Sequence, residues 1–387
     1  MMDAVKLVIA GAALLLLAAG AVVSGVLPPA DVAGIVERVA PILAFVVAVT
    51  VVAELAATAG VFDIAAGRLA RASRGRTVAL WLLVVALAVV STAFLSLDTT
   101  AVLLTPVVVA VARANGLPPL PFAFTTVWLA NTASLVLPVS NLTNLLALDR
   151  LPAGGAGAFI ALQGPSAIVA IVVSVALLFV IHRRTLRGRF DPAPLPRVTD
   201  RVQLVVASVV VLALMPALVS GLEPWIPATI AAVILLALFA WRSPRALSPR
   251  LIPWQLLVFA AGLFTAMAAL ESLGSATVVA VVAGEPGGPL ELWRMAGTAV
   301  VAANTVDNLP AYLLLESSAD TPERLAALLI GVNAGPLITP WASLATLLWH
   351  ERLRAVGVEV PWRRFVLWGL VAAPLVVGLA VVPLALR

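Results

Sequence analysis

The chain has little charge and no cysteine. Only 11% of its 387 residues are charged and its mean hydropathy is +1.11, whereas a typical soluble domain carries about 25% charged residues. This composition argues against a water-soluble protein. The absence of cysteine excludes disulfides, thiolate metal sites and cysteine nucleophiles. No long polar stretch remains for a separate catalytic domain, so the length is best divided into membrane spans of about 20 residues.

Hydrophobic runs of uneven length predict an all-α polytopic membrane protein. The runs at 100–112 and 309–315 are too short to span a bilayer, and that at 119–148 is too long for one simple helix. Such unevenness is typical of helices that are broken, or that enter the membrane and return. We expect about nine spanning helices. To these we add two re-entrant hairpins and two broken helices, at 78–112, 291–316, 119–149 and 322–354.

Basic residues divide the loops into two sets. Nineteen of the 24 Lys and Arg residues are Lys6, Arg113 and those of four segments, 61–77, 182–201, 242–250 and 352–364. The other loops lean acidic. By the positive-inside rule the basic set is cytoplasmic, which predicts a cytoplasmic N-terminus and an external C-terminus. The first apolar run shows no clear cleavage site, and we interpret it as a retained span.

The two halves of the chain echo each other at a constant offset of 202 residues. The segments Asn131–Leu146 and Asn333–Leu348 both begin with Asn and carry proline at the eighth position, Pro138 and Pro340. The loop charges make the two halves antiparallel, which is typical of secondary transporters built from inverted repeats. The expected divisions are a scaffold helix (1–37), a first repeat (38–182), a cytoplasmic linker (183–200), scaffold helices (201–252) and a second repeat with the C-terminal helix (253–387).

Acidic residues within apolar runs are costly, and only three of the 19 acids lie there: Glu54, Asp98 and Asp307. A buried carboxyl holds a proton more tightly, so all three are candidates for proton coupling. The Ser, Thr and Asn side chains nearby either cap broken helices and join neighbours or bind a solute. The candidate substrate-binding residues are Ser96, Asp98, Thr99, Asn131, Ser134, Ser140, Asn141, Asn144, Asp307, Asn308, Asn333, Thr339, Ser343 and Thr346.

The four polar segments contain no Lys or Arg, which limits the solute. Two carboxylates without a base suit a neutral polyhydroxyl solute or a cation better than a multivalent anion. Proton-coupled antiport follows as the expected mechanism. We expect no cofactor and no nucleic-acid partner, only the solute, protons and the lipid bilayer.

The same segments resemble those of the bacterial arsenite-efflux permease (ArsB) family, within the ion transporter superfamily. The residues that carry the resemblance are Phe94–Pro106, Ala130–Leu146, Asp307–Pro310 and Gly335–Trp349, of which the last is the most specific. The resemblance implies export of arsenite or antimonite, as neutral hydroxides, across the bacterial plasma membrane in exchange for protons. It also implies a soluble ATPase subunit in some members and a homodimer. It assigns hairpin tips to Ser96–Thr100 and Val306–Leu309, and helix breaks to Leu137–Thr143 and Ile338–Ala345.

Other carriers on the same scaffold stay open as alternatives: a sodium/proton antiporter, a dicarboxylate or sulfate symporter, or a silicic-acid-type exporter. The related sodium-coupled dicarboxylate carriers have Ser-Asn-Thr at both tips. This chain instead has Ser-Leu-Asp at 96–98 and Val-Asp-Asn at 306–308, which argues against a sodium–carboxylate site. An enzyme is not expected, because the sequence offers no plausible nucleophile–base set or metal-ligand spacing.

Overall fold

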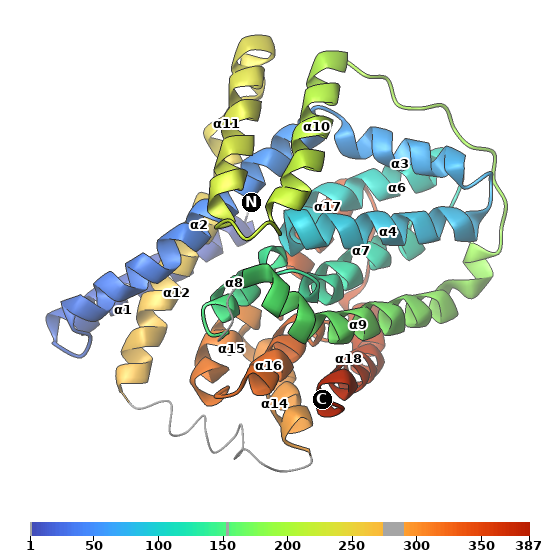
Figure 1. The fold of residues 1–387 in the computed structure, drawn as a ribbon. Helices are drawn as coiled ribbons and strands as arrows, with labels where there is room; N and C mark the ends of the chain where they lie inside the picture. Colours follow the sequence, from blue (N-terminus) through green and yellow to red (C-terminus); the bar gives the residue numbers. More distant parts are fainter. Residues whose placement is uncertain (1, 152–154, 274–289) are drawn as a thin grey trace.

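A computed structural model describes residues 2–151, 155–273 and 290–387, and these residues form helices without strands (Figure 1). An isolated β-bridge joins Arg76 to Arg189. Among the described residues, six stretches are long and apolar enough to cross a membrane: Ala30–Thr58, Thr77–Leu95, Leu97–Ala114, Gly155–Leu186, Trp225–Arg242 and Trp362–Ala385. Three shorter apolar helices are Gly11–Val23, Arg201–Ala217 and Trp254–Leu270. The predicted all-α polytopic class is confirmed.

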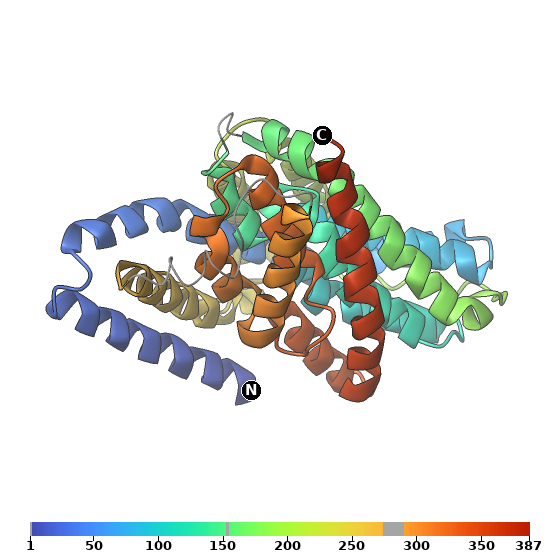
Figure 2. The same cartoon turned by 90° about the horizontal axis from the view of Figure 1, so that it is seen from below.

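Five long helices pack together beside the two hairpins and the two broken helices. Helix α1 lies along α12, and α2 lies along α11, with α10 beside α11 (Figures 1 and 2). Their bounds are Met2–Val23 (α1), Pro29–Thr58 (α2), Arg201–Ala217 (α10), Trp225–Arg242 (α11) and Trp254–Ser272 (α12), with short turns η4 (Pro244–Ala246) and η5 (Pro249–Leu251) before α12.

The first repeat contains a hairpin, a broken helix and a long closing helix. The hairpin consists of α4 (Thr77–Leu95), α5 (Leu97–Thr99), the π-helical η1 (Thr100–Leu104) and α6 (Thr105–Ala114). The broken helix consists of α7 (Leu120–Thr132), η2 (Ala133–Leu135), η3 (Pro138–Ser140) and α8 (Leu142–Leu148). Helix α3 (Val61–Ala72) precedes the hairpin, and α9 (Gly155–Leu186) follows the broken helix.

The second repeat presents the same order of elements. Its hairpin consists of α14 (Glu291–Val306) and α15 (Asn308–Leu315), followed by η6 (Glu316–Ser318). Its broken helix consists of α16 (Pro322–Ala334) and α17 (Leu344–Ala355), and α18 (Trp362–Ala385) closes it. Helix α18 packs along α9, so the closing helices of the two repeats lie side by side.

Both helix breaks have the same backbone conformation at matching positions. Leu137 is extended (φ −130°, ψ 153°) because proline at 138 disfavours the helical conformation of the residue before it. Asn141 (φ −151°, ψ 149°) and Ser343 (φ −151°, ψ 131°) are extended N-caps of α8 and α17. They are 202 residues apart, so the offset found in the sequence is also an offset in structure.

The basic segments lie together on one side of the molecule. The Phe190 N–H donates to Gly75 O at 2.9 Å, which joins the linker to the loop before α4. Arg242 contacts Asp200 at 2.7 Å, and this guanidinium holds the pKa of the Asp200 carboxyl below its usual value. Arg113 donates to Gly357 O at 3.0 Å. These contacts connect the segments that the charge pattern assigned to one face.

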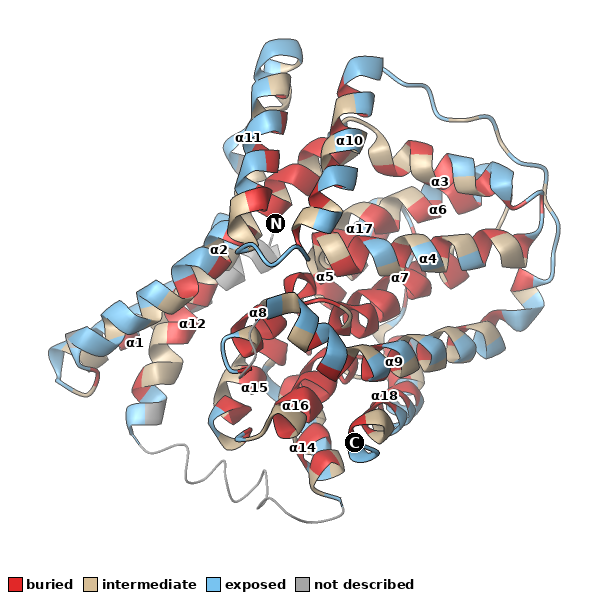
Figure 3. Ribbon diagram, in the orientation of Figure 1, coloured by how far each residue is buried: buried red, intermediate tan, exposed pale blue. Residues whose placement is uncertain are grey.

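An aromatic cluster fixes the second repeat against the first. Phe124 of α7 packs edge-on against Trp349 of α17, with ring centres 5.5 Å apart, and against Trp368 of α18 at 4.6 Å. The Trp349 Nε1–H donates to Ala123 O at 2.8 Å. The buried residues concentrate around α7, α16 and the helix breaks (Figure 3). The two broken helices therefore pack directly against each other.

Candidate functional site

Each hairpin turns at one residue with an unusual backbone conformation. Ser96 has φ 87° and ψ 160°, and Asp307 has φ 92° and ψ 157°. Both side chains cap the helix that follows: Ser96 Oγ accepts from Thr99 N–H at 3.3 Å, and Asp307 Oδ1 accepts from Leu309 N–H at 3.2 Å. By residue type Asp98 and Asp307 occupy corresponding polar segments of the two halves, but the structure aligns Asp307 with Ser96 and places Asp98 two residues beyond the first tip.

Hydroxyl groups stiffen the first hairpin around Asp98. Thr100 Oγ1 donates to Ser91 Oγ at 2.9 Å and accepts from Thr92 Oγ1 at 3.0 Å. Thr105 and Thr126 share a hydrogen bond of 2.8 Å, which ties the hairpin to α7. The π-helical turn η1 begins just after Asp98, and such turns are frequent at functional sites.

The two aspartates belong to different repeats, and both are half-buried. Asp98 lies close enough to Asp307 for their carboxyl groups to interact electrostatically, and the Leu344 N–H at the start of α17 also lies close to Asp307. Glu54 instead interacts with Arg352, near the basic face of the molecule. The structure thus brings together two of the three predicted proton-coupling residues and leaves Glu54 apart.

Asn333 joins the two helix breaks. Its Oδ1 accepts hydrogen bonds from Asn141 Nδ2 at 2.5 Å and Thr143 Oγ1 at 3.0 Å, and its Nδ2 donates to Asn144 Oδ1 at 2.7 Å. Asn144 Nδ2 in turn donates to Ser134 O at 2.6 Å. All of these side chains are buried. Four of the predicted polar residues are therefore part of one network across the repeat boundary.

The residues related to this network by the 202-residue offset behave differently. Asn131 Nδ2 donates to Val127 O in its own helix at 2.9 Å, while its Oδ1 has no partner. Ser343 Oγ and Thr346 Oγ1 also have none, although all three side chains are fully buried. Buried polar atoms are normally hydrogen-bonded, so these three atoms are exceptions that the bonds within the protein do not explain.

A second set of bonds holds the second hairpin to its own helix break. Asn304 Oδ1 accepts from Thr339 N–H at 2.9 Å, and Asn304 O accepts from Trp341 Nε1 at 2.8 Å. At the first hairpin, Ser140 Oγ donates to Ala93 O at 3.0 Å. Thr339 and Ser140 therefore secure hairpins to breaks.

The remaining predicted residues have local roles. Ser134 Oγ donates to Asn131 O at 2.6 Å, within the end of the first broken helix. Thr99 Oγ1 accepts from Ser96 Oγ at 3.3 Å, beside the first tip. Asn308 is buried at the first position of α15, directly after the second tip.

Sequence reasoning missed a buried polar pair on α9. Gln163 and Ser166 are fully buried, and neither the Gln163 carboxamide nor the Ser166 hydroxyl has a hydrogen-bond partner. The two residues are three apart and therefore share one face of the helix. The sequence could have indicated this pair, because a carboxamide side chain inside a long apolar run is uncommon.

Sequence reasoning also missed an ionic cluster on the face opposite the basic loops. Arg38 of α2 contacts Glu316 at 2.5 Å and Asp149 at 3.7 Å, and Tyr312 donates its hydroxyl to Glu316 at 3.2 Å. Partial burial raises the pKa of Asp149 above its usual value, an effect that Arg38 partly offsets. Arg38 was one of the five basic residues outside the predicted cytoplasmic set. That position could have indicated an ionic cluster on the opposite face.

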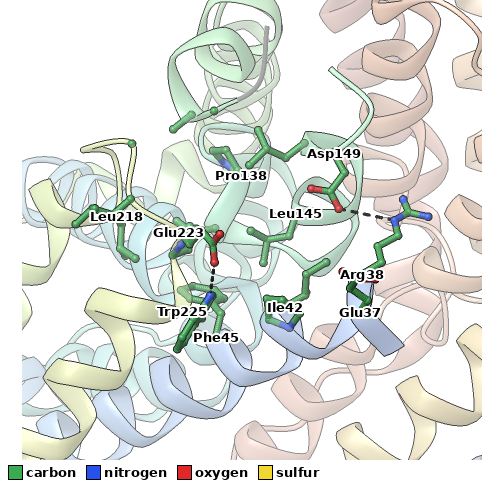
Figure 4. Close-up of a pocket in the computed structure, with 18 residues that line it drawn as sticks. Glu37, Arg38, Ile42, Phe45, Pro138, Leu145, Asp149, Leu218, Glu223 and Trp225 are labelled. Atoms are coloured by element: carbon green, nitrogen blue, oxygen red, sulfur yellow. Dashed lines mark hydrogen bonds and ion pairs between the residues drawn. The ribbon is translucent and has the colours of Figure 1, made fainter. Parts of the chain in front are cut away.

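Beside this cluster lies a cavity of about 370 Å³ (Figure 4). Its lining includes Arg38, Asp149 and the break residues Pro138 and Val139. Glu223, on the other side, accepts a hydrogen bond from Trp225 Nε1 at 2.5 Å. The cavity therefore extends from charged groups at the ends of helices to the break of the first repeat.

The fold and its centre define a polytopic membrane transporter built from two inverted repeats. The family model described as citrate transporter (CitMHS) matches residues 2–346, and the chain belongs to this family. The chain is 30% identical to the arsenical pump membrane protein of Escherichia coli K12 over 396 residues, covering 95% of this chain and 91% of that protein. The protein of the same name from Yersinia enterocolitica is 29% identical, with 96% and 92% covered. The resemblance to arsenite permeases is confirmed.

A solved structure shares the fold. The YdaH transporter of Alcanivorax borkumensis, whose crystal structure is described as having an unusual topology, aligns with a TM-score of 0.59 at 14% identity. The alignment covers 92% of this chain and 86% of that one. The likeness supports the arrangement of helices, and the family and its relatives indicate a membrane transporter, not a catalytic enzyme.

Proposed function

We propose that the protein exports trivalent arsenite and antimonite, as neutral hydroxides, in exchange for protons. The observation that carries the proposal is the pairing of Asp98 with Asp307 in a centre whose polar segments lack Lys and Arg. The names of the arsenical pump relatives support the choice of solute. The clustered basic segments support a bacterial plasma membrane location with the N-terminus cytoplasmic and the C-terminus outside.

The chemistry of the centre suits a neutral trihydroxide. Such a solute offers three O–H donors, which carboxylate and carboxamide oxygens accept. A multivalent anion would meet uncompensated carboxylates, and two like charges 4 Å apart repel by about 4 kcal/mol at an effective dielectric constant of 20. Because the chain has no cysteine, no thiolate can bind the trivalent arsenic or antimony atom tightly, which allows release.

Coupling follows from competition for the same oxygens. An ionised carboxylate can only accept hydrogen bonds, whereas a protonated one also donates and has fewer free acceptors. Protonation of Asp98 or Asp307 therefore opposes binding of a solute that donates its hydroxyl hydrogens. Protons arriving from outside would release the solute there, and loss of the protons inside would restore the binding form. This mutual exclusion is the requirement for antiport.

Two assays test the proposal. Cells that lack their own exporter should gain arsenite resistance when they express this chain, and everted vesicles should accumulate arsenite when acidified inside. Absence of both effects, with the protein present in the membrane at normal levels, contradicts the proposal. A variant lacking both carboxylates, Asp98→Asn with Asp307→Asn, provides the matched inactive control.

The citrate transporter description of the family favours a second candidate, carboxylate transport. A substrate panel in proteoliposomes should include citrate, dicarboxylates, sulfate, silicic acid and sodium/proton exchange. Sodium-stimulated carboxylate uptake would favour this candidate over arsenite export. The Asp98–Asp307 pair would then not be a site for a neutral solute.

A further inference from the structure

The 202-residue offset between the helix breaks defines two half-sites with different hydrogen bonding. Asn131, Asn141 and Asn144 of the first repeat correspond by the 202-residue offset to Asn333, Ser343 and Thr346 of the second. If the repeats were equivalent, each central Asn would be held by the break of the other repeat. Only Asn333 is held in this way.

The half-site around Asn333 has no free capacity at the central carboxamide oxygen. Asn333 Oδ1 receives two hydrogen bonds, from Asn141 and Thr143, and a carboxamide oxygen has two lone pairs. Asn333 Nδ2 uses a hydrogen for Asn144. A solute arriving there would have to break bonds that connect α16 to α8.

The half-site around Asn131 is open in hydrogen-bonding terms. It contains three unpartnered atoms that together accept and donate: Asn131 Oδ1, Ser343 Oγ and Thr346 Oγ1. Helix α7 carries Asn131 and packs against α17. Ser343 is the N-cap of α17, and Thr346 lies in its first turn. Helix α5 packs against both α7 and α17. Asp98 lies on α5, and Asp307 lies near Leu344 N–H. Both carboxylates are therefore associated with the open half-site.

We infer that the two half-sites have different roles. Asn333 and its hydrogen-bond partners hold the two repeats together. Asn131, Ser343 and Thr346 bind the hydroxyl groups of the transported solute. The identity of that solute rests on the proposed function, but the division of tasks rests on the hydrogen bonds alone. Leaving three buried polar atoms without partners destabilises the empty protein, and a hydroxylated ligand removes that penalty. Occupancy by such a solute is therefore favoured at this half-site.

A matched pair of isosteric substitutions tests the division. Thr143 and Thr346 are both fully buried just after a helix break, but Thr143 is hydrogen-bonded and Thr346 is not. Thr143→Val removes the hydrogen bond to Asn333 that helps to hold the repeats together, so the melting temperature of the empty protein in detergent should fall by about 2–4 °C. Thr346→Val removes an unpartnered hydroxyl, so the melting temperature should stay unchanged or rise.

Transport then separates binding from folding. In everted vesicles, Thr346→Val and Ser343→Ala should each raise the arsenite concentration for half-maximal uptake on the order of tenfold, the loss expected for a hydrogen bond. The inference is overturned if Thr346→Val lowers the melting temperature as much as Thr143→Val does, or if both half-saturation values stay at the wild-type level. If the wild type carries no arsenite, the proposed function fails instead, and the melting-temperature pair alone decides the inference.

Discussion

Ser96 and Asp307 adopt the same strained backbone conformation at the tips of two hairpins that belong to different repeats. Their φ and ψ angles agree within about 5°, in a region that is almost exclusive to glycine. In each case the side chain caps the next helix, at Thr99 N–H or Leu309 N–H. Because the strain occurs at both tips, it is a feature that the two repeats share. The caps help to stabilise this strained conformation.

Substitutions at the first tip should separate strain from capping. Ser96→Gly relieves strain of about 1–3 kcal/mol and loses only a few tenths from the cap, so the protein should become more stable. Ser96→Ala keeps the strain and loses the cap, which costs about 1 kcal/mol. Thermal unfolding in detergent should rank the variants Gly above wild type above Ala. An Ala variant at least as stable as the Gly variant would remove the argument for strain.

Neutralising either central carboxyl should uncouple transport from pH. In Asp307→Asn the side-chain oxygen that caps Leu309 is retained, so the tip should stay folded, yet the group no longer exchanges a proton. Acid-driven arsenite flux should fall by a factor on the order of 10, within the usual range of coupling energies, and should lose its pH dependence. Asp98→Asn should behave likewise. Asp191→Asn, in the exposed linker, is the control and should keep both rate and pH dependence.

The helix order was predictable because proline and polar segments interrupt apolar runs, and both effects are local. Pro138 and Pro340 fall at the observed breaks, and the tip segments at 96–100 and 306–309 contain the observed turns. The register between the hairpins was not predictable. The residue types suggested that Asp98 corresponds to Asp307, but the backbone conformation matches Asp307 with Ser96. The identity of a residue does not reveal its φ angle.

The hydrogen-bond partners of the centre were also beyond prediction. The sequence gives Asn131 and Asn333 equal status, since both begin the same motif. Their different bonding depends on which side chains of the opposite repeat reach them across some 190 residues of chain. Arg38 and Glu316 likewise meet across 278 residues, and no periodic pattern encodes such a contact.

The Arg38–Glu316 pair should stabilise the packing of α2 against the second hairpin. Glu316 is nearly buried, with a side chain 9% exposed, so Glu316→Gln leaves Arg38 without its shortest charged partner. A hydrogen bond to a charged group contributes about 1.5–3 kcal/mol, and we expect a loss near the lower end because Arg38 is 35% exposed. Thermal unfolding measures the loss. Glu37→Gln, at an exposed neighbouring acid, should change nothing, and equal effects of the two would contradict this role.

Helix α18 should tolerate a methyl group at one glycine and not at another. A Cβ at Gly369 would overlap Leu337 O and lie 2.8 Å from Ile338 Cα, both backbone atoms of the second helix break. Gly369→Ala should therefore destabilise the protein by about 1–3 kcal/mol and reduce arsenite export by displacing the break. Gly378→Ala, on the same helix, meets no atom within 4 Å and is the control. Equal stability of the two variants would show that α18 does not fix the break.

The sidedness of the loops can be tested directly because the wild-type chain has no cysteine to remove. Ser220 lies in the turn between α10 and α11, and Ser248 lies in the basic segment before α12; both are exposed. If the basic face is cytoplasmic, a membrane-impermeant maleimide should label Ser220→Cys in intact cells and Ser248→Cys only after permeabilisation. The reverse pattern would invert the topology.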